Sequence, residues 1–193
     1  SIILFSLTIL INFGYGKSVK ESEITQRDGK VYLVNSNKPY SGKVVSYHEN
    51  GQLKKSINFI NGQLEGLIQV WYENGNLEES VNFKNGQLVG KYEIYHENGQ
   101  LEQLGKYVNG QLEGLIQIWY ENGNLQELAD FINGELNGQV EIYHENGQLK
   151  ESSNFKNGQL DGLVETYYEN GQLWFLGNYK ADQSIGNFEY YDE

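Results

Sequence analysis

Apolar and polar residues alternate along most of this chain, and the alternation restarts every 24 residues. A glycine recurs at this 24-residue interval from Gly42 to Gly186. A strict period of this length is typical of a repeat array, in which each unit buries its apolar side chains against its neighbours. The clearest marker is Glu-Asn-Gly, which recurs without drift at residues 49–51, 73–75, 97–99, 121–123, 145–147 and 169–171.

One unit, residues 66–89 (GLIQVWYENGNLEESVNFKNGQLV), indicates how the array is built. It contains two Asn-Gly pairs flanked by alternating apolar residues, which is the strongest local signal for a β-hairpin. Both central residues of a type I′ turn need positive φ, which Asn-Gly tolerates best, so we expect this turn at both pairs. Two turns give two strands per unit. The sequence therefore predicts an all-β fold: an elongated, single-sheet antiparallel β-meander built from 24-residue double-strand repeats.

The alternation also assigns side chains to the two faces of the sheet. In the first strand of this unit, Ile68 and Val70 share one face, while Trp71 lies on the other. In the second strand, Leu77 and Val81 line up on one face. Apolar side chains of neighbouring units should then form ladders, which hold a sheet together.

The units alternate in type, and the two ends depart from the pattern. Residues 28–42 form a degenerate unit, in which Pro39 suits an edge strand because it lacks an N–H. At the other end, Ala181-Asp182 replaces Asn-Gly. We expect both ends to cap the sheet. The alternation appears as a 48-residue period, with His48, His96 and His144 in one kind of unit and Tyr72, Tyr120 and Tyr168 in the other.

The N-terminus carries an apolar run, residues 2–13 (IILFSLTILINF). It is shorter than the ~20 residues of a membrane span and is followed by Gly14-Tyr15-Gly16, a small-x-small pattern. This combination is typical of a secretory signal peptide, with an uncleaved anchor as the competing interpretation. We therefore predict a signal peptide at 1–16, a linker at 17–27 and the repeat array at 28–193. The expected location is the periplasm, the cell surface or the medium, or the cytoplasm if the segment is not a signal.

Charge and composition exclude several classes of function. The net charge of −12 argues against nucleic acid, whose phosphates require a basic face. The chain has no cysteine, so disulfides and thiolate metal sites are excluded. The three histidines are four strands apart, roughly 19 Å, too far to share one metal ion. No catalytic or cofactor motif is present, so we predict a protein that is not an enzyme and that has no cofactor and no metal site.

The unit resembles the bacterial variant of the MORN repeat. The residues that carry the resemblance are Trp71-Tyr72-Glu73-Asn74-Gly75-Asn76-Leu77, then Phe83-Lys84-Asn85-Gly86-Gln87-Leu88, then Gly90. The stretch from Asp28-Gly29 to Gly42 is similar to the opening of the YwqK-like antitoxin family proteins. The resemblance implies a binding or scaffolding role, and the antitoxin similarity implies a toxin as the partner.

Two repeated rows are candidates for contact with a partner. The turn glutamates lie two strands apart, roughly 10 Å, and would form an acidic stripe for a basic partner, or simply a solvated edge. The aromatic residues opposite the aliphatic face would form a contact surface if that face stays wet, or core if the sheet curls around it. Gln69, Glu93, Gln117, Glu141 and Glu165 lie beside them. The candidate partner-binding residues are Glu73, Glu97, Glu121, Glu145, Trp71, Tyr95, Trp119 and Tyr143.

The function expected from these features is that of a non-catalytic exported repeat protein, which mediates protein–protein interaction through its aromatic and acidic rows. The partner would be a protein, with a basic toxin or a surface protein as examples. Two alternatives stay open: an antitoxin or immunity protein that neutralises a toxin, and a cell-surface carbohydrate-binding module that takes a glycan. After removal of the signal peptide no membrane span is expected.

Overall fold

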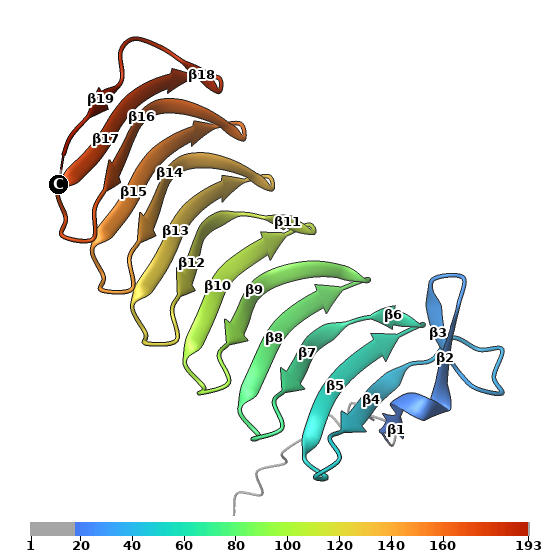
Figure 1. Cartoon of the computed structure of the whole chain (residues 1–193). Coiled ribbons are helices and arrows are strands. Elements are labelled where there is room, and N and C mark those ends of the chain that lie inside the picture. Colours follow the sequence, from blue (N-terminus) through green and yellow to red (C-terminus); the bar gives the residue numbers. More distant parts are fainter. Residues whose placement is uncertain (1–17, 193) are drawn as a thin grey trace, which may run out of the picture.

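The structure is a computed structural model that describes residues 18–192. Within this range, 17 strands form one sheet and two more form a separate hairpin. Successive strands of the repeats pair antiparallel, so the sheet is a one-layer meander, as predicted (Figure 1). The predicted signal peptide, residues 1–16, lies outside the described residues. In residues 18–192, we find no helix with the length and apolar character needed to cross a membrane.

Each unit contributes a first and a second strand. The first strands are β4 (Gly42–Tyr47), β7 (Gly66–Trp71), β9 (Gln87–Tyr95), β12 (Gly114–Trp119), β14 (Glu135–Tyr143) and β16 (Gln159–Tyr167). The second strands are β5 (Leu53–Ile60), β8 (Leu77–Lys84), β10 (Leu101–Val108), β13 (Leu125–Ile132), β15 (Leu149–Lys156) and β17 (Leu173–Lys180). Short segments β6 (Gln63–Leu64) and β11 (Gln111–Leu112) precede β7 and β12.

The strands all curve in the same sense, so the sheet forms an arched ribbon (Figure 1). The periodic glycine lies where each first strand bends: Gly66 has a φ of 76° and Gly90 a φ of 74°. Each of these glycines pairs with an aromatic residue of the next strand, Gly66 with Phe83 and Gly90 with Tyr107. Glycine permits the bend because it adopts positive φ without strain.

The core lies on one face of the sheet, which we call the buried face. Ile68, Val81, Tyr92 and Ile116 are only 5–7% exposed, although no second layer covers them. Ile68 pairs with Val81, and Val81 with Tyr92, across neighbouring strands, and partly buried side chains of the same face, such as Phe83, pack against the cluster. Side chains of this face therefore shield one another. These four residues belong to a row that crosses the middle of the buried face from strand to strand. Its other members include Gly105, Ala129, Val140, Ser153, Val164 and Gly177.

The two turns of each unit differ in type. Asn85 and Gly86 have φ values of 51° and 78°, as a type I′ turn requires. In the Glu-Asn-Gly turn only the glycine has positive φ, 90° at Gly75, and the Gly75 N–H donates to the Tyr72 carbonyl at 3.0 Å. This is a three-residue loop built on a type I turn that ends in a glycine bulge. The prediction of type I′ at both turns is therefore wrong for Glu-Asn-Gly.

The leucine that follows this turn lies on the other face from the one predicted. Val70 pairs with Glu79, but the next pair along the ladder is Trp71 with Leu77, so Glu78 is an extra residue. Directly paired residues share a face, and the extra residue therefore moves Leu77 to the face of Trp71. The expected alignment of Leu77 with Val81 is wrong for this reason.

Both ends of the sheet are covered. At the N-terminal end, β1 (Val19–Lys20) pairs in parallel with β4, and η1 (Glu21–Glu23) leads to the hairpin of β2 (Ile24–Arg27) and β3 (Lys30–Leu33). Apolar residues of β1 and β2 pack with Tyr40, Val44 and Phe59. Residues 18–27, which fall in the expected linker, are therefore part of the cap. At the C-terminal end, β18 (Gln183–Ser184) and β19 (Glu189–Tyr190) pair with β17.

Candidate functional site

The face opposite the buried face, which we call the open face, carries an apolar stripe. It consists of directly paired aromatic and leucine residues, such as Trp71 with Leu77 and Tyr95 with Leu101. These side chains are partly exposed, and Tyr47 at one end is 53% exposed. The whole aromatic–leucine stripe is Tyr47, Leu53, Trp71, Leu77, Tyr95, Leu101, Trp119, Leu125, Tyr143, Leu149, Tyr167 and Leu173.

The four aromatic candidates therefore share one face. Trp71, Tyr95, Trp119 and Tyr143 occupy equivalent positions at the ends of their strands, and all four are partly exposed. Most of the buried positions belong to the opposite face, although Val45, Ser56 and Ser152 on the open face are buried as well. The leucines of the stripe were not among the predicted site residues. The extra residue after each Glu-Asn-Gly turn moves them to this face, and the alternation of apolar and polar residues does not reveal that extra residue.

Three tyrosines of the stripe, Tyr95, Tyr143 and Tyr167, are each coupled to a glutamate two residues before them. The Tyr143 hydroxyl donates to Glu141 Oε2 at 2.7 Å. Burial, followed by this hydrogen bond, raises the pKa of Tyr143 to about 12. Burial and the neighbouring Glu165 also raise the pKa of Tyr167. A phenol that stays protonated is a permanent donor, and it therefore fixes the carboxylate beside it.

The tryptophans of the stripe have glutamine in place of the glutamate. Gln69 precedes Trp71 and Gln117 precedes Trp119, whereas Glu93 precedes Tyr95. Tryptophan has no hydroxyl to donate to a carboxylate. The open face thus has two kinds of unit, one neutral and one anionic. The sequence itself shows this association, because glutamine stands two residues before each tryptophan of the stripe and glutamate two residues before Tyr95, Tyr143 and Tyr167.

The anionic units differ in whether the charge is compensated. Lys91 Nζ lies 2.6 Å from Glu93 Oε1 and forms an ion pair with it. Glu141, Glu165 and Glu189 make no ion pair with a lysine or arginine within residues 18–192. Three successive units at the C-terminal end therefore present uncompensated carboxylates along the open face.

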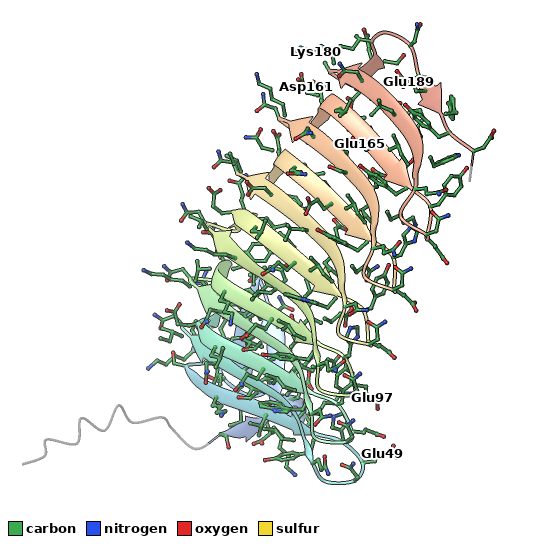
Figure 2. The ribbon with its side chains drawn as sticks, turned by 90° about the vertical axis from the view of Figure 1, so that its left-hand side faces the viewer. Glu49, Glu97, Asp161, Glu165, Lys180 and Glu189 are labelled. Atoms are coloured by element: carbon green, nitrogen blue, oxygen red, sulfur yellow. The ribbon has the colours of Figure 1, made fainter. Side chains whose placement is uncertain are left out.

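The turn glutamates form a row along one long edge of the sheet. Figure 2 shows Glu49 and Glu97 on this edge, with Asp161 and Lys180 on the opposite edge. The Glu97 backbone is held by Asn74, whose Nδ2 donates to the Glu97 carbonyl at 2.8 Å. The carboxylates themselves are exposed, so this edge is acidic. The same bond recurs from Asn50 to Glu73, Asn98 to Glu121, Asn122 to Glu145 and Asn146 to Glu169.

The structure brings two candidate glutamates, Glu121 and Glu145, to one hollow at this edge. The hollow has a volume of about 370 Å³ and lies between neighbouring turns. Its other lining residues include His96, whose Nε2 lies 2.8 Å from the Trp119 carbonyl. Glu73 and Glu97 do not line it. The hollow is open and polar, as expected for a groove between stacked turns.

The histidines connect successive units. His48 Nε2 lies 2.7 Å from the Trp71 carbonyl, and in the alternate units the Tyr72 hydroxyl donates to the Tyr95 carbonyl at 2.7 Å. Histidine and tyrosine thus make the same contact in alternate units, so either residue is compatible with this position of the repeat. Within residues 18–192, no three histidine, aspartate or glutamate side chains are grouped closely enough to hold a metal ion.

The repeats of this sequence match a known protein family. A family model described as the MORN repeat variant matches residues 40–61, 64–85, 88–109, 112–133, 136–157 and 160–181, well over half of the chain. The chain belongs to the MORN repeat variant family. None of the curated proteins compared with the chain matches it. The similarity to YwqK-like antitoxin proteins therefore stays a prediction.

Membership in the family has a functional consequence at a coarse level. MORN repeats often serve interaction with proteins or membranes. Each matched segment of the MORN array contains one aromatic and one leucine residue of the stripe, as Trp71 and Leu77 show for 64–85. The stripe is therefore a property of the repeat itself.

Proposed function

We propose that this MORN array is a non-catalytic scaffold that binds a protein partner on its open face. The observation that carries the proposal is the aromatic–leucine stripe, which runs through all six matched units and stays partly exposed. Exposed apolar surface of this extent is typical of interaction sites. Tyrosine and tryptophan are also enriched among the few residues that dominate the binding energy at protein interfaces.

The length of the stripe favours an extended partner. It crosses the strands from β4 to β17, and neighbouring strands lie about 4.8 Å apart, so it is roughly 50 Å long. A segment of that length would span several units at once. The acidic edge and the net charge of −12 favour a basic partner, since complementary charge speeds encounter and sets orientation.

We also propose that the chain acts after export. The support is the apolar run at residues 2–13, followed by the small-x-small pattern Gly14-Tyr15-Gly16. The partner would then be met in the periplasm, at the cell surface or outside the cell.

Two alternatives use the same surfaces. An antitoxin would cover a basic toxin with the turn glutamates, so changing Glu73, Glu97 and Glu121 to glutamine should weaken it. A carbohydrate-binding module would stack sugars on Trp71 and Trp119. Replacing those two residues should then abolish glycan binding and leave the glutamine variant active.

The proposal is tested by photo-cross-linking in cells that express the full-length chain. A benzophenone amino acid is placed at Tyr95, on the open face, or at Tyr107, on the buried face of the next strand. Both positions are partly exposed tyrosines, so they form a matched pair. We expect adducts with a defined protein from position 95 and none from position 107, in the exported fraction.

Equal adducts from the two positions would contradict use of the open face. Adducts found only in the cytosol, on an unprocessed chain, would contradict export and would favour the antitoxin alternative. Preserved circular dichroism and melting of both variants show that the fold is intact.

A further inference from the structure

Equivalent side chains recur along the open face at a fixed distance. Equivalent residues of successive units lie two strands apart, and strands are 4.7–4.9 Å apart, so the repeat is about 9.4–9.8 Å. A ligand with the same repeat places the same group against every unit. The anionic units Tyr143–Glu141, Tyr167–Glu165 and Tyr191–Glu189 follow one another at this distance.

Polyproline II is the regular peptide conformation whose repeat fits this distance. It advances about 3.1 Å per residue with three residues per turn, so every third side chain returns to the same side after about 9.3 Å. A helix returns after seven residues, about 10.5 Å, and drifts by roughly 1 Å per unit. A β-strand presents the same side every two residues, at about 6.6 or 13.2 Å, and misses the repeat.

The chemistry of these units selects a cation. Glu141, Glu165 and Glu189 make no ion pair within residues 18–192. Their tyrosine partners hold the carboxylates in place, as the 2.7 Å bond from Tyr143 to Glu141 shows. An arginine can bind such a carboxylate through two hydrogen bonds and stack on the neighbouring ring.

The chain itself provides an example of this contact. In the unit of β9, Lys91 Nζ binds the equivalent carboxylate, Glu93, at 2.6 Å. The corresponding positions before the anionic glutamates are Gln139, Leu163 and Asn187, which carry no charge. An internal lysine therefore occupies the site in one unit. In the unit of β14 a neutral donor takes this place, since Gln139 Nε2 donates to Glu141 Oε1 at 3.0 Å. Within residues 18–192 no cationic side chain compensates the three C-terminal carboxylates, which leaves them to a cationic ligand.

We propose that the partner binds through a polyproline II segment with arginine or lysine at every third residue. The segment runs across the strands from β14 to β19, and its cations contact Glu141, Glu165 and Glu189. Its prolines and aliphatic stems lie on the aromatic–leucine stripe, as in other aromatic-lined sites for proline-rich peptides. The inference rests on the proposed function and names the chemistry of the partner for the same face.

The test uses the full chain and synthetic peptides. One peptide consists of four Pro-Pro-Arg triplets, a second has the same composition with irregularly spaced arginines, and a third is a helical peptide with arginine at every seventh residue. Affinities are measured by isothermal titration calorimetry at two salt concentrations. We expect the regular peptide to bind at least about tenfold more tightly than either control.

Two variants with equal change in net charge locate the site. Glu165→Gln removes the central carboxylate of the row, and we expect it to weaken the regular peptide by about tenfold, as for loss of a charged hydrogen bond. Glu169→Gln changes a turn glutamate of the same unit and should alter affinity by less than about twofold.

Three results would overturn the inference: equal affinity for regular and irregular peptides, tighter binding of the helical peptide, or equal loss in the two variants. Failure of every peptide overturns it as well. If cross-linking at Tyr95 still traps a protein in that case, the proposed function stands and only the chemistry of the partner is wrong.

Discussion

Single residues in the middle of the buried face explain how a one-layer sheet excludes water. Large side chains of one strand cover small ones of the next. A Cβ at Gly105 would lie 2.3 Å from Tyr92 Cε1 and 2.4 Å from Ile116 Cδ1, so both side chains lie over this glycine. At the corresponding positions Ala129 and Ser153 are each 1% exposed. The small residues are covered because their neighbours are large, and such close packing leaves little room for an added methyl group.

We expect Gly105→Ala to lower the free energy of unfolding by about 1–3 kcal/mol. The added methyl group has no room unless the Tyr92 ring and the Ile116 side chain move, and both are buried in the core. Urea unfolding followed by circular dichroism measures the change.

Ser153→Ala is the matched control in the same row. The Ser153 hydroxyl is buried and has no hydrogen-bond partner within the described residues. Its removal should leave stability unchanged or raise it by up to about 1 kcal/mol. A Gly105→Ala variant as stable as the parent would contradict the packing of Tyr92 over the glycine.

At the scale of elements, the turns join successive units along both edges of the sheet. On one edge the Gly86 N–H donates to the Leu64 carbonyl in β6, just after the preceding turn, at 2.9 Å. On the other, Asn98 Oδ1 accepts from the Gln100 N–H at 2.8 Å, and its Nδ2 donates to the Glu121 carbonyl at 3.0 Å. The asparagine of Glu-Asn-Gly thus shapes its own turn and binds the next one.

We expect Asn98→Asp to destabilise the array by about 1–2 kcal/mol. Aspartate keeps the acceptor for the Gln100 N–H but loses the donor, and it places a charge against the Glu121 carbonyl. The change therefore removes the bond between units, together with a long contact of 3.5 Å from Asn98 Nδ2 to Gln100 Oε1. Thermal and urea unfolding of the full chain measure it.

Asn109→Asp is the control on the opposite edge. The Asn109 side chain makes no hydrogen bond within the described residues, and aspartate tolerates its φ of 51°. Stability should stay within about 0.5 kcal/mol of the parent. Similar losses in the two variants would show that charge, and not the bond to Glu121, is responsible.

The elements were predictable where one local rule decides the outcome. The alternation around Asn85-Gly86 predicted two strands and a type I′ turn, and the structure has both. The Glu-Asn-Gly turn was assigned the wrong type because Asn74 keeps negative φ when a third loop residue is available. The extra residue at Glu78 then moved Leu77 to the other face. No periodicity records such a bulge, since it depends on how the two strands pair.

At the scale of the whole molecule, the array is held together by contacts between neighbouring units and by its two caps. The period alone was sufficient to predict this architecture. The candidate site was only partly predictable: the sequence indicated the aromatic row and the turn glutamates. The alternation alone did not show whether this row stays partly exposed, because that depends on whether another part of the chain covers its face.

Tyrosines throughout the array make its stability sensitive to alkaline pH. Burial, with a smaller effect from Tyr107, raises the pKa of Tyr92 to about 12 from an ordinary value of 10.0. The pKa of Tyr143 is also raised to about 12. Smaller increases affect tyrosines from the first cap to the last, namely Tyr40, Tyr72, Tyr95, Tyr167 and Tyr191.

We expect the free energy of unfolding to fall steeply between pH 10 and about 12. Below pH 10 these tyrosines are protonated in both states, so their contribution to stability is fully present. Above it the unfolded chain loses its phenolic protons first, because the folded state binds them more tightly, and ionisation then favours unfolding. Urea midpoints at a series of pH values measure the decline.

Tyr92→Phe removes one of these protons and should make the decline shallower, while its stability at neutral pH stays close to that of the parent. An equally steep decline in Tyr92→Phe would contradict the contribution assigned to burial of the Tyr92 phenol.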